Sequence, residues 1–114
     1  MTTVEKPWGH EMIWAVTDRY VGKILHVRAG EALSLQYHRV KDEMVMVLSG
    51  RLRFEFFAEG ELPSVCELGP HEPFHVAPGL RHRMTAIEDT DVLEVSTTEL
   101  DDVVRLEDRY GRTP

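Results

Sequence analysis

The sequence predicts an all-β barrel or sandwich, and three observations support this prediction. Short apolar runs recur along the chain, turn residues separate them, and residues 51–56 alternate cleanly between polar and apolar side chains. Many strand-length segments divided by glycine, proline or aspartate are typical of all-β barrels and sandwiches. Because 114 residues suit one domain and leave no room for two, we expect a single domain over residues 1–114.

The expected strands follow from these apolar runs and from the turn residues that end them. In chain order they cover residues 12–16, 20–27, 33–38, 43–48, 51–57, 65–68, 74–77, 82–87 and 92–96. Ser49-Gly50 predicts a tight hairpin turn, because glycine reaches positive φ at little cost. Glu59-Gly60-Glu61 predicts an exposed hairpin tip. Residues 97–106 place Ser/Thr and acidic residues before an apolar pair, which predicts a short C-terminal helical turn with an N-cap.

The run from Met44 to Leu48 is apolar on both faces of its expected strand. Its outer face is therefore expected to be covered by a second sheet or by a subunit partner, which would make the protein a homodimer. A strand buried on both sides within a monomer fits the pattern equally well.

Composition and charge exclude several classes of partner. The net charge is −7, whereas nucleic acids and anionic membranes are bound by basic surfaces. We therefore expect no nucleic-acid or membrane partner, although a small anionic ligand needs only a few well-placed bases. Cys66 is the only cysteine, so no internal disulfide forms, and we read it as a packed thiol. With no signal peptide visible, a cytoplasmic location is expected.

Four polar residues form a candidate metal site. Gln36 and His38 lie two apart on one expected strand, so their side chains leave the same face. Glu43 opens the next strand after a short polar turn, and His82 begins a later strand. Two imidazoles, a carboxylate and an amide oxygen suit one divalent Zn, Fe, Mn, Co or Ni ion better than Ca or Mg. In an octahedral ion they leave two positions open for a ligand.

The spacing of these residues resembles the first cupin motif. Five residues lie between Gly30 and Gln36, one before His38, four before Glu43 and six before Gly50. The resemblance implies a cupin fold, a double-stranded β-helix or jelly-roll barrel, with this motif at about residues 30–50.

The second cupin motif, expected as Pro-x-Gly-x-x-His, falls at about residues 69–86. Its Gly-x-x-His part matches Gly79 to His82, while the proline sits one place late, at Pro78. His71 stands where the family has an earlier glycine. Neither difference removes a ligand.

Within the cupins, the sequence resembles the type II mannose-6-phosphate isomerase-like group in particular. Glu5 to Glu11, Gly30 to His38 and Asp101 to Arg112 are similar to three segments of that family, and the last is absent from cupins in general. The resemblance implies a metal-dependent aldose–ketose isomerase acting on a phosphorylated sugar. The chain departs from the family at residues 39–42 and 44–45, where the family places histidines and a His-Trp pair.

Such a reaction needs a metal to polarise a carbonyl and cations to bind phosphate. Lys23 is a candidate if its strand face points inward, and a lysine at the barrel rim is the alternative. Arg105, in the matched C-terminal segment, either closes over the cavity mouth or pairs with Asp101 or Asp102. His75 reaches the cavity or is structural. Two other functions stay open: a non-catalytic sugar- or metabolite-binding or regulatory cupin, and an Fe-dependent dioxygenase.

Overall fold

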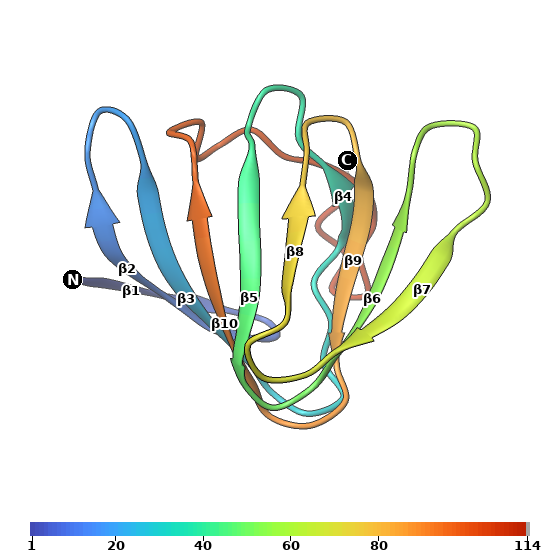
Figure 1. The fold of residues 1–114 in the computed structure, drawn as a ribbon, viewed down its shortest axis with the longest axis horizontal. Helices are drawn as coiled ribbons and strands as arrows, with labels where there is room; N and C mark the ends of the chain where they lie inside the picture. The colour runs from blue at the N-terminus through green and yellow to red at the C-terminus, as the bar shows by residue number, and fades with distance from the viewer. Residues whose placement is uncertain (114) are drawn as a thin grey trace.

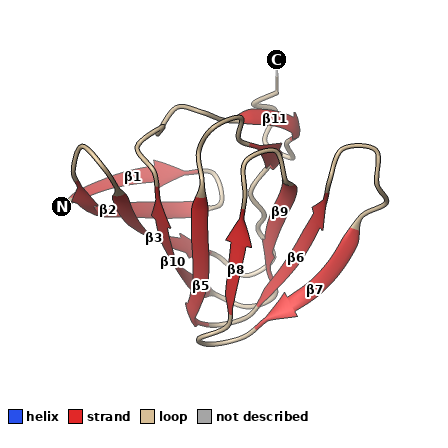
Figure 2. Ribbon diagram, turned by 45° about the horizontal axis from the view of Figure 1, so that its top comes forward, coloured by secondary structure: helices blue, strands red, loops and turns tan. Residues whose placement is uncertain are grey.

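The regular structure of this chain is built from strands alone. The computed structural model describes residues 1–113. Its strands are β1 (Thr2–Lys6), β2 (Gly9–Val16), β3 (Val21–Val27), β4 (Leu35–Tyr37), β5 (Glu43–Ser49), β6 (Leu52–Phe57), β7 (Ser64–Leu68), β8 (Pro73–Val76), β9 (Arg81–Ala86), β10 (Thr90–Ser96) and β11 (Val104–Glu107). The ribbon in Figure 2 accordingly contains strands and loops only.

Two antiparallel sheets face each other and enclose the core. Their strand orders are β1-β2-β3-β10-β5-β8 and β11-β4-β9-β6-β7. In Figure 1 the strands converge toward the bottom of the view, and the loops that follow β4, β8 and β10 gather at the top. The predicted all-β fold is confirmed, and residues from both sheets meet at the upper end.

All nine expected strands are present, with ends that differ by up to three residues. Two further strands, β1 and β11, are added. The sequence of β1 is largely polar, and its side chains are mostly exposed. No apolar pattern therefore predicted this strand. It forms because its backbone pairs with β2 along its whole length, from Thr2 opposite Ile13 to Lys6 opposite Gly9.

The short helical turn predicted for residues 97–106 is wrong. Residues 98–103 form turns, and Val104 and Arg105 pair with Tyr37 and Gln36 as part of β11. Without β11, strand β4 would be a sheet edge with unsatisfied backbone groups. Pairing with that edge outweighs the weak local preference for a helix. The described part of the chain has no helix of the length and apolar character needed to cross a membrane.

The turn at Ser49-Gly50 exists, but the hairpin prediction is wrong. Gly50 has φ +93° and sits against the backbone of Asp89 and Thr90, where a Cβ would come within 2.4 Å of Asp89 O. The turn carries the chain from one sheet to the other, because β5 pairs with β8 and β10 whereas β6 pairs with β7 and β9. By contrast, the tip at Glu59-Gly60-Glu61 does join two paired strands, β6 and β7.

The apolar core lies between the two sheets. Its buried members are Trp8, Leu25, Val27, Val45, Val47, Leu52, Phe54, Leu68, Val76, Met84, Ala86 and Val92. Strand β5 buries Val45 and Val47 inward. Its outer face stays open to solvent in the single chain, with Met44 41% exposed.

Phe54 is expected to be a large single contributor to stability. Its side chain is fully buried, and its ring centroid lies 4.3 Å from that of Phe74. Phe54→Ala should lower the free energy of unfolding by about 3–5 kcal/mol, since it removes a large apolar group and leaves a cavity. Val65→Ala on β7, at a side chain that is 50% exposed, should change it by less than about 0.5 kcal/mol. Urea unfolding followed by circular dichroism measures both, and equal shifts would contradict the assignment of the core.

Candidate metal centre

Three of the four predicted metal ligands meet at the upper end of the barrel. His38 follows β4, Glu43 opens β5 and His82 is the second residue of β9. All three are buried, and one ligand atom from each lies within 4.8 Å of the others. Glu43 Oε1 is 3.4 Å from His38 Nε2 and 3.6 Å from His82 Nε2. This is a compact arrangement of the kind that holds one ion.

The backbone fixes the tautomer of both imidazoles. His38 Nδ1 lies 2.6 Å from the carbonyl oxygen of Asp102, and His82 Nδ1 lies 3.0 Å from that of Leu80. A carbonyl only accepts, so each Nδ1 carries the proton and donates it. Each Nε2 then presents a lone pair toward Glu43, which is the arrangement that orients histidine ligands.

These lone pairs have no hydrogen-bond partner within residues 1–113. Both Nε2 atoms are buried, and nothing in that part of the chain donates to them. A buried polar atom without a partner is costly and calls for an explanation. A metal ion bound to the two Nε2 atoms and to Glu43 Oε1 would satisfy them, so the residues fit a cation.

Gln36 lies beside this cluster on the neighbouring strand. Its Cα pairs directly with that of His82 across β4 and β9, and it lines the same cavity as His38. The hydroxyl of Ser34 donates a 2.6 Å hydrogen bond to Gln36 Oε1. This contact orients the amide while a carbonyl oxygen keeps a second lone pair.

Local charges prepare Glu43 and His82 for a cation. Burial alone would raise the pKa of Glu43, but its close contact with His38 and the positive charge of Lys41 outweigh it and hold the pKa well below its usual range. Burial lowers the pKa of His82. At neutral pH Glu43 is therefore anionic and His82 is neutral, which are the forms that bind metals.

Two buried charged residues beside the site were not predicted. The Nζ atom of Lys41 lies 3.1 Å from Glu43 Oε2 and 3.3 Å from Glu94 Oε2. Burial and the nearby charge of Glu43 raise the pKa of Glu94 to about 7, against the opposing charges of Lys41 and Lys23. The inward position of Glu94 could have been predicted, because it lies two residues from both Val92 and Ser96, which face inward on the same strand. No sequence pattern indicated that Lys41, which lies in a loop, is buried.

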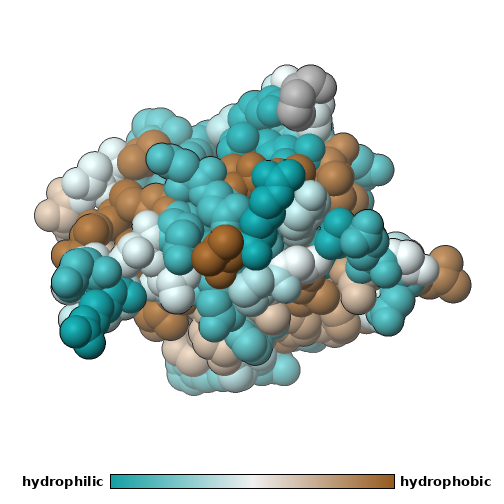
Figure 3. All heavy atoms as spheres, turned by 90° about the horizontal axis from the view of Figure 1, so that it is seen from above, coloured by the Kyte–Doolittle hydropathy of each residue, from teal (hydrophilic) through white to brown (hydrophobic). Residues whose placement is uncertain are grey.

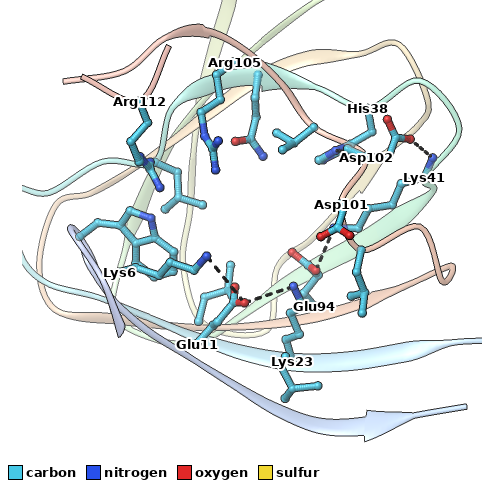
Figure 4. A pocket seen from close by; sticks show the side chains of 17 residues that line it. Lys6, Glu11, Lys23, His38, Lys41, Glu94, Asp101, Asp102, Arg105 and Arg112 are labelled. Carbon is cyan, nitrogen blue, oxygen red and sulfur yellow. Dashed lines mark hydrogen bonds and ion pairs between the residues drawn. The ribbon is translucent and has the colours of Figure 1, made fainter. Parts of the chain in front are cut away.

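A cavity of about 290 Å³ opens in front of the site. Its charged lining consists of the cations Lys6, Lys23, Lys41, Arg105 and Arg112 and the acids Glu11, Glu94, Asp101 and Asp102. In Figure 4, Arg105 and Arg112 enter from one side, while Lys6, Glu11 and Lys23 line the side opposite. Seen from above, the loop-bearing end of the molecule is a mosaic of hydrophilic residues and apolar patches (Figure 3).

The structure brings both predicted cations, Lys23 and Arg105, to this cavity. Lys23 is on the inner face of β3, only 8% exposed, and its Nζ lies 3.5 Å from Glu11 Oε1. Arg105 on β11 pairs with Gln36, one strand from His82. Its Nε is buried and has no hydrogen-bond partner within residues 1–113. Lys23 thus has a counter-ion, whereas Arg105 Nε offers an unused donor.

His75 does not line this cavity. Its side chain is 56% exposed on the outer side of β8, and its Nε2 lies 2.7 Å from Asp42 Oδ1. The structural role considered for it fits this surface ion pair.

Sequence comparison identifies the family of this chain and several similar proteins. A family described as "Mannose-6-phosphate isomerase C-terminal" matches residues 1–108. The mannose-1-phosphate guanylyltransferase ManC of Salmonella typhimurium is 36% identical over 117 residues, covering 96% of this chain and 23% of that protein. The xanthan biosynthesis protein XanB of Xanthomonas campestris is 32% identical over 115 residues, covering 96% and 24%. The chain thus spans about a quarter of the length of these relatives.

Solved structures agree on the fold. A variant of oxalate decarboxylase from Bacillus subtilis superposes with a TM-score of 0.83 at 18% identity, over 99% of this chain and 32% of that chain. KdgF from Halomonas sp. superposes with a TM-score of 0.75 at 21% identity, over 89% of both chains. Both neighbours are cupins. The chain belongs to the mannose-6-phosphate isomerase C-terminal family and has a cupin fold, as its motifs predict.

Proposed function

We propose that this chain holds one divalent transition metal ion, Zn, Fe, Mn, Co or Ni, through Gln36, His38, Glu43 and His82. The observation that supports it best is the pair of buried imidazoles whose Nε2 lone pairs face Glu43 Oε1 and have no other partner within residues 1–113. Mixed nitrogen and oxygen donors of this kind suit first-row transition metals. Four protein ligands would leave two positions of an octahedral ion open for water or a small molecule.

We further propose that the site performs sugar-phosphate isomerase-like chemistry of the aldose–ketose type. A bound metal supplies polarisation of the substrate carbonyl. Arg105, with its unused donor, binds the phosphate group, because a guanidinium matches two phosphate oxygens at once. Lys23 is a second cation in the same cavity, with its Nζ 3.5 Å from Glu11 Oε1. The family to which the chain belongs supports this class of substrate.

A second candidate is a binding or regulatory module for the same class of small molecule. One observation favours it: Glu11, a carboxylate of the cavity, is already paired with a lysine, Lys23. A paired carboxylate is a poorer base for removing a proton from carbon. In this case the cavity would bind a phosphorylated sugar without turnover.

We also propose that the chain forms a homodimer through the outer face of the larger sheet. Two cross-strand rows cover this face: Met12, Ile24, Leu93 and Met46, and beside it Trp14, Gly22, Val95 and Met44. Neither row contains a charged residue. Trp14, whose side chain is 51% exposed, lies over Gly22. Two copies that each carry a charge of −7 can meet through such an uncharged face without burying like charges against each other.

Removing one imidazole should abolish metal binding. After chelation and reloading, the wild-type protein should retain about one metal ion per chain in elemental analysis, and His38→Ala should lose it. His75→Ala, at an exposed histidine outside the cavity, should retain it. Metal at about 100 times its dissociation constant should stabilise the wild type by about 2.7 kcal/mol. Equal metal content in both variants would rule out the proposed site.

The isomerase proposal predicts interconversion of mannose 6-phosphate and fructose 6-phosphate with deuterium uptake at C2, followed by NMR in deuterated water. Arg105→Met should lower kcat/KM roughly 10- to 100-fold, the loss of a charged hydrogen bond worth about 1.5–3 kcal/mol. Arg53→Met, at a surface arginine paired with Glu55, should leave it unchanged. Binding of the sugar phosphate with neither turnover nor exchange would favour the binding module, and oxygen uptake with Fe(II) would favour a dioxygenase.

The dimer proposal predicts a mass of about two chains in sedimentation equilibrium, falling to one chain in Val95→Asp. Val95 is 45% exposed in the centre of the apolar face, so a carboxylate there would be buried unpaired in the dimer. Val65→Asp on the other sheet, at a residue of similar exposure, should remain dimeric. A monomeric wild type at high concentration would contradict the proposal.

A further inference from the structure

The loop between His38 and β5 carries one buried residue among exposed ones. Arg39, Val40 and Asp42 are exposed, whereas Lys41 is only 5% exposed. The carboxylate of Asp102 accepts hydrogen bonds from the backbone N–H groups of residues 39, 40 and 41 at 3.0, 2.7 and 2.8 Å. The loop is therefore fixed in a shape that directs a lysine side chain into the barrel, against the usual preference of lysine for water.

The ammonium group of Lys41 lies between two buried carboxylates. It is 3.1 Å from Glu43 Oε2 and 3.3 Å from Glu94 Oε2. Both acids are at most 5% exposed, so solvent screens these contacts little. A buried charge persists when it is paired and hydrogen-bonded. Lys41 forms an ion pair with Glu43 and donates a hydrogen bond to Glu94.

The two oxygens of Glu43 consequently have different neighbours. Oε1 faces the two imidazole Nε2 atoms at 3.4 and 3.6 Å, whereas Oε2 faces the Lys41 ammonium. The Lys41 ammonium, 3.1 Å from Oε2, competes with a metal ion for that oxygen and repels a second cation beside it. We propose that Lys41 is a positioning residue that makes Glu43 a one-oxygen ligand and so preserves the open positions of the metal ion.

This inference rests on the proposed metal site and not on the isomerase chemistry. With four single-atom ligands, an octahedral ion keeps two positions for water or ligand. If Glu43 bound through both oxygens, one of those positions would be lost. Lys41 thus determines how many atoms of a small molecule can bind to the metal ion.

Water-proton relaxation by Mn²⁺ tests this directly, because it reports the water molecules bound to the ion. Chelator-stripped wild type, Lys41→Met and Lys41→Arg would be loaded with Mn²⁺ at one fixed pH. Lys41→Met should lower the relaxation per bound Mn²⁺ to roughly half, since one of two water positions is filled by Glu43 Oε2. Lys41→Arg retains a cation and should behave as the wild type.

Two further variants separate positioning from folding. Lys41→Met leaves Glu94 buried without its cation, and this single variant can therefore fail to fold. The double variant Lys41→Met/Glu94→Gln removes both charges of that pair. It should show the same halved relaxation. Glu94→Gln alone keeps Lys41 on Glu43 and should relax water as the wild type does. Circular dichroism confirms folding in each case.

Unchanged or increased relaxation in a folded variant that lacks Lys41 would overturn the positioning role while leaving the metal site standing. A wild type that binds no Mn²⁺ and no other divalent transition metal would overturn both proposals. Either result is independent of whether any sugar phosphate is turned over.

Discussion

The organisation of the site depends on the contacts that Asp102 makes with the loop before β5. Its side chain accepts three backbone hydrogen bonds from residues 39–41, which lower its pKa to about 2, and its carbonyl oxygen accepts from His38 Nδ1. One residue near the end of the chain therefore fixes a loop conformation and the tautomer of an imidazole. The direction of Lys41 follows from that loop, and the free lone pair of His38 follows from that tautomer.

The charged groups buried in the barrel interior are stabilised by ion pairs. Glu43 and Glu94 share Lys41, and Lys23 contacts Glu11. A buried ion pair adds little net stability, whereas removing one partner leaves a charge uncompensated. These charges lie next to the apolar core: the ring of Phe54 stacks against that of His82, with centroids 6.1 Å apart. The polar site is thus built directly on the packed interior of the barrel.

Much of this architecture was predictable from the sequence, because local patterns determine it. Apolar runs between turn residues marked every strand that has a buried face, and motif spacing brought together His38, Glu43 and His82. What could not be predicted depends on pairing between distant segments. Strand β11 forms because the edge of β4 needs a partner, and the turn at Ser49-Gly50 changes sheets because β5 and β6 find different neighbours. Lys41 is buried because Asp102, 61 residues away, shapes its loop.

The pairing of β4 with β11 affects the order of folding events as well as the folded structure. Gln36 lies opposite Arg105, and β3 pairs with β10 across a similar stretch of chain. Contacts between such distant residues form slowly, because the intervening chain must first be ordered. His38 and Glu43 precede Asp102 along the chain, so the carbonyl that orients His38 is made after both of them. Capture of a metal ion is therefore expected to be a late event in folding, one that reports the completion of the barrel.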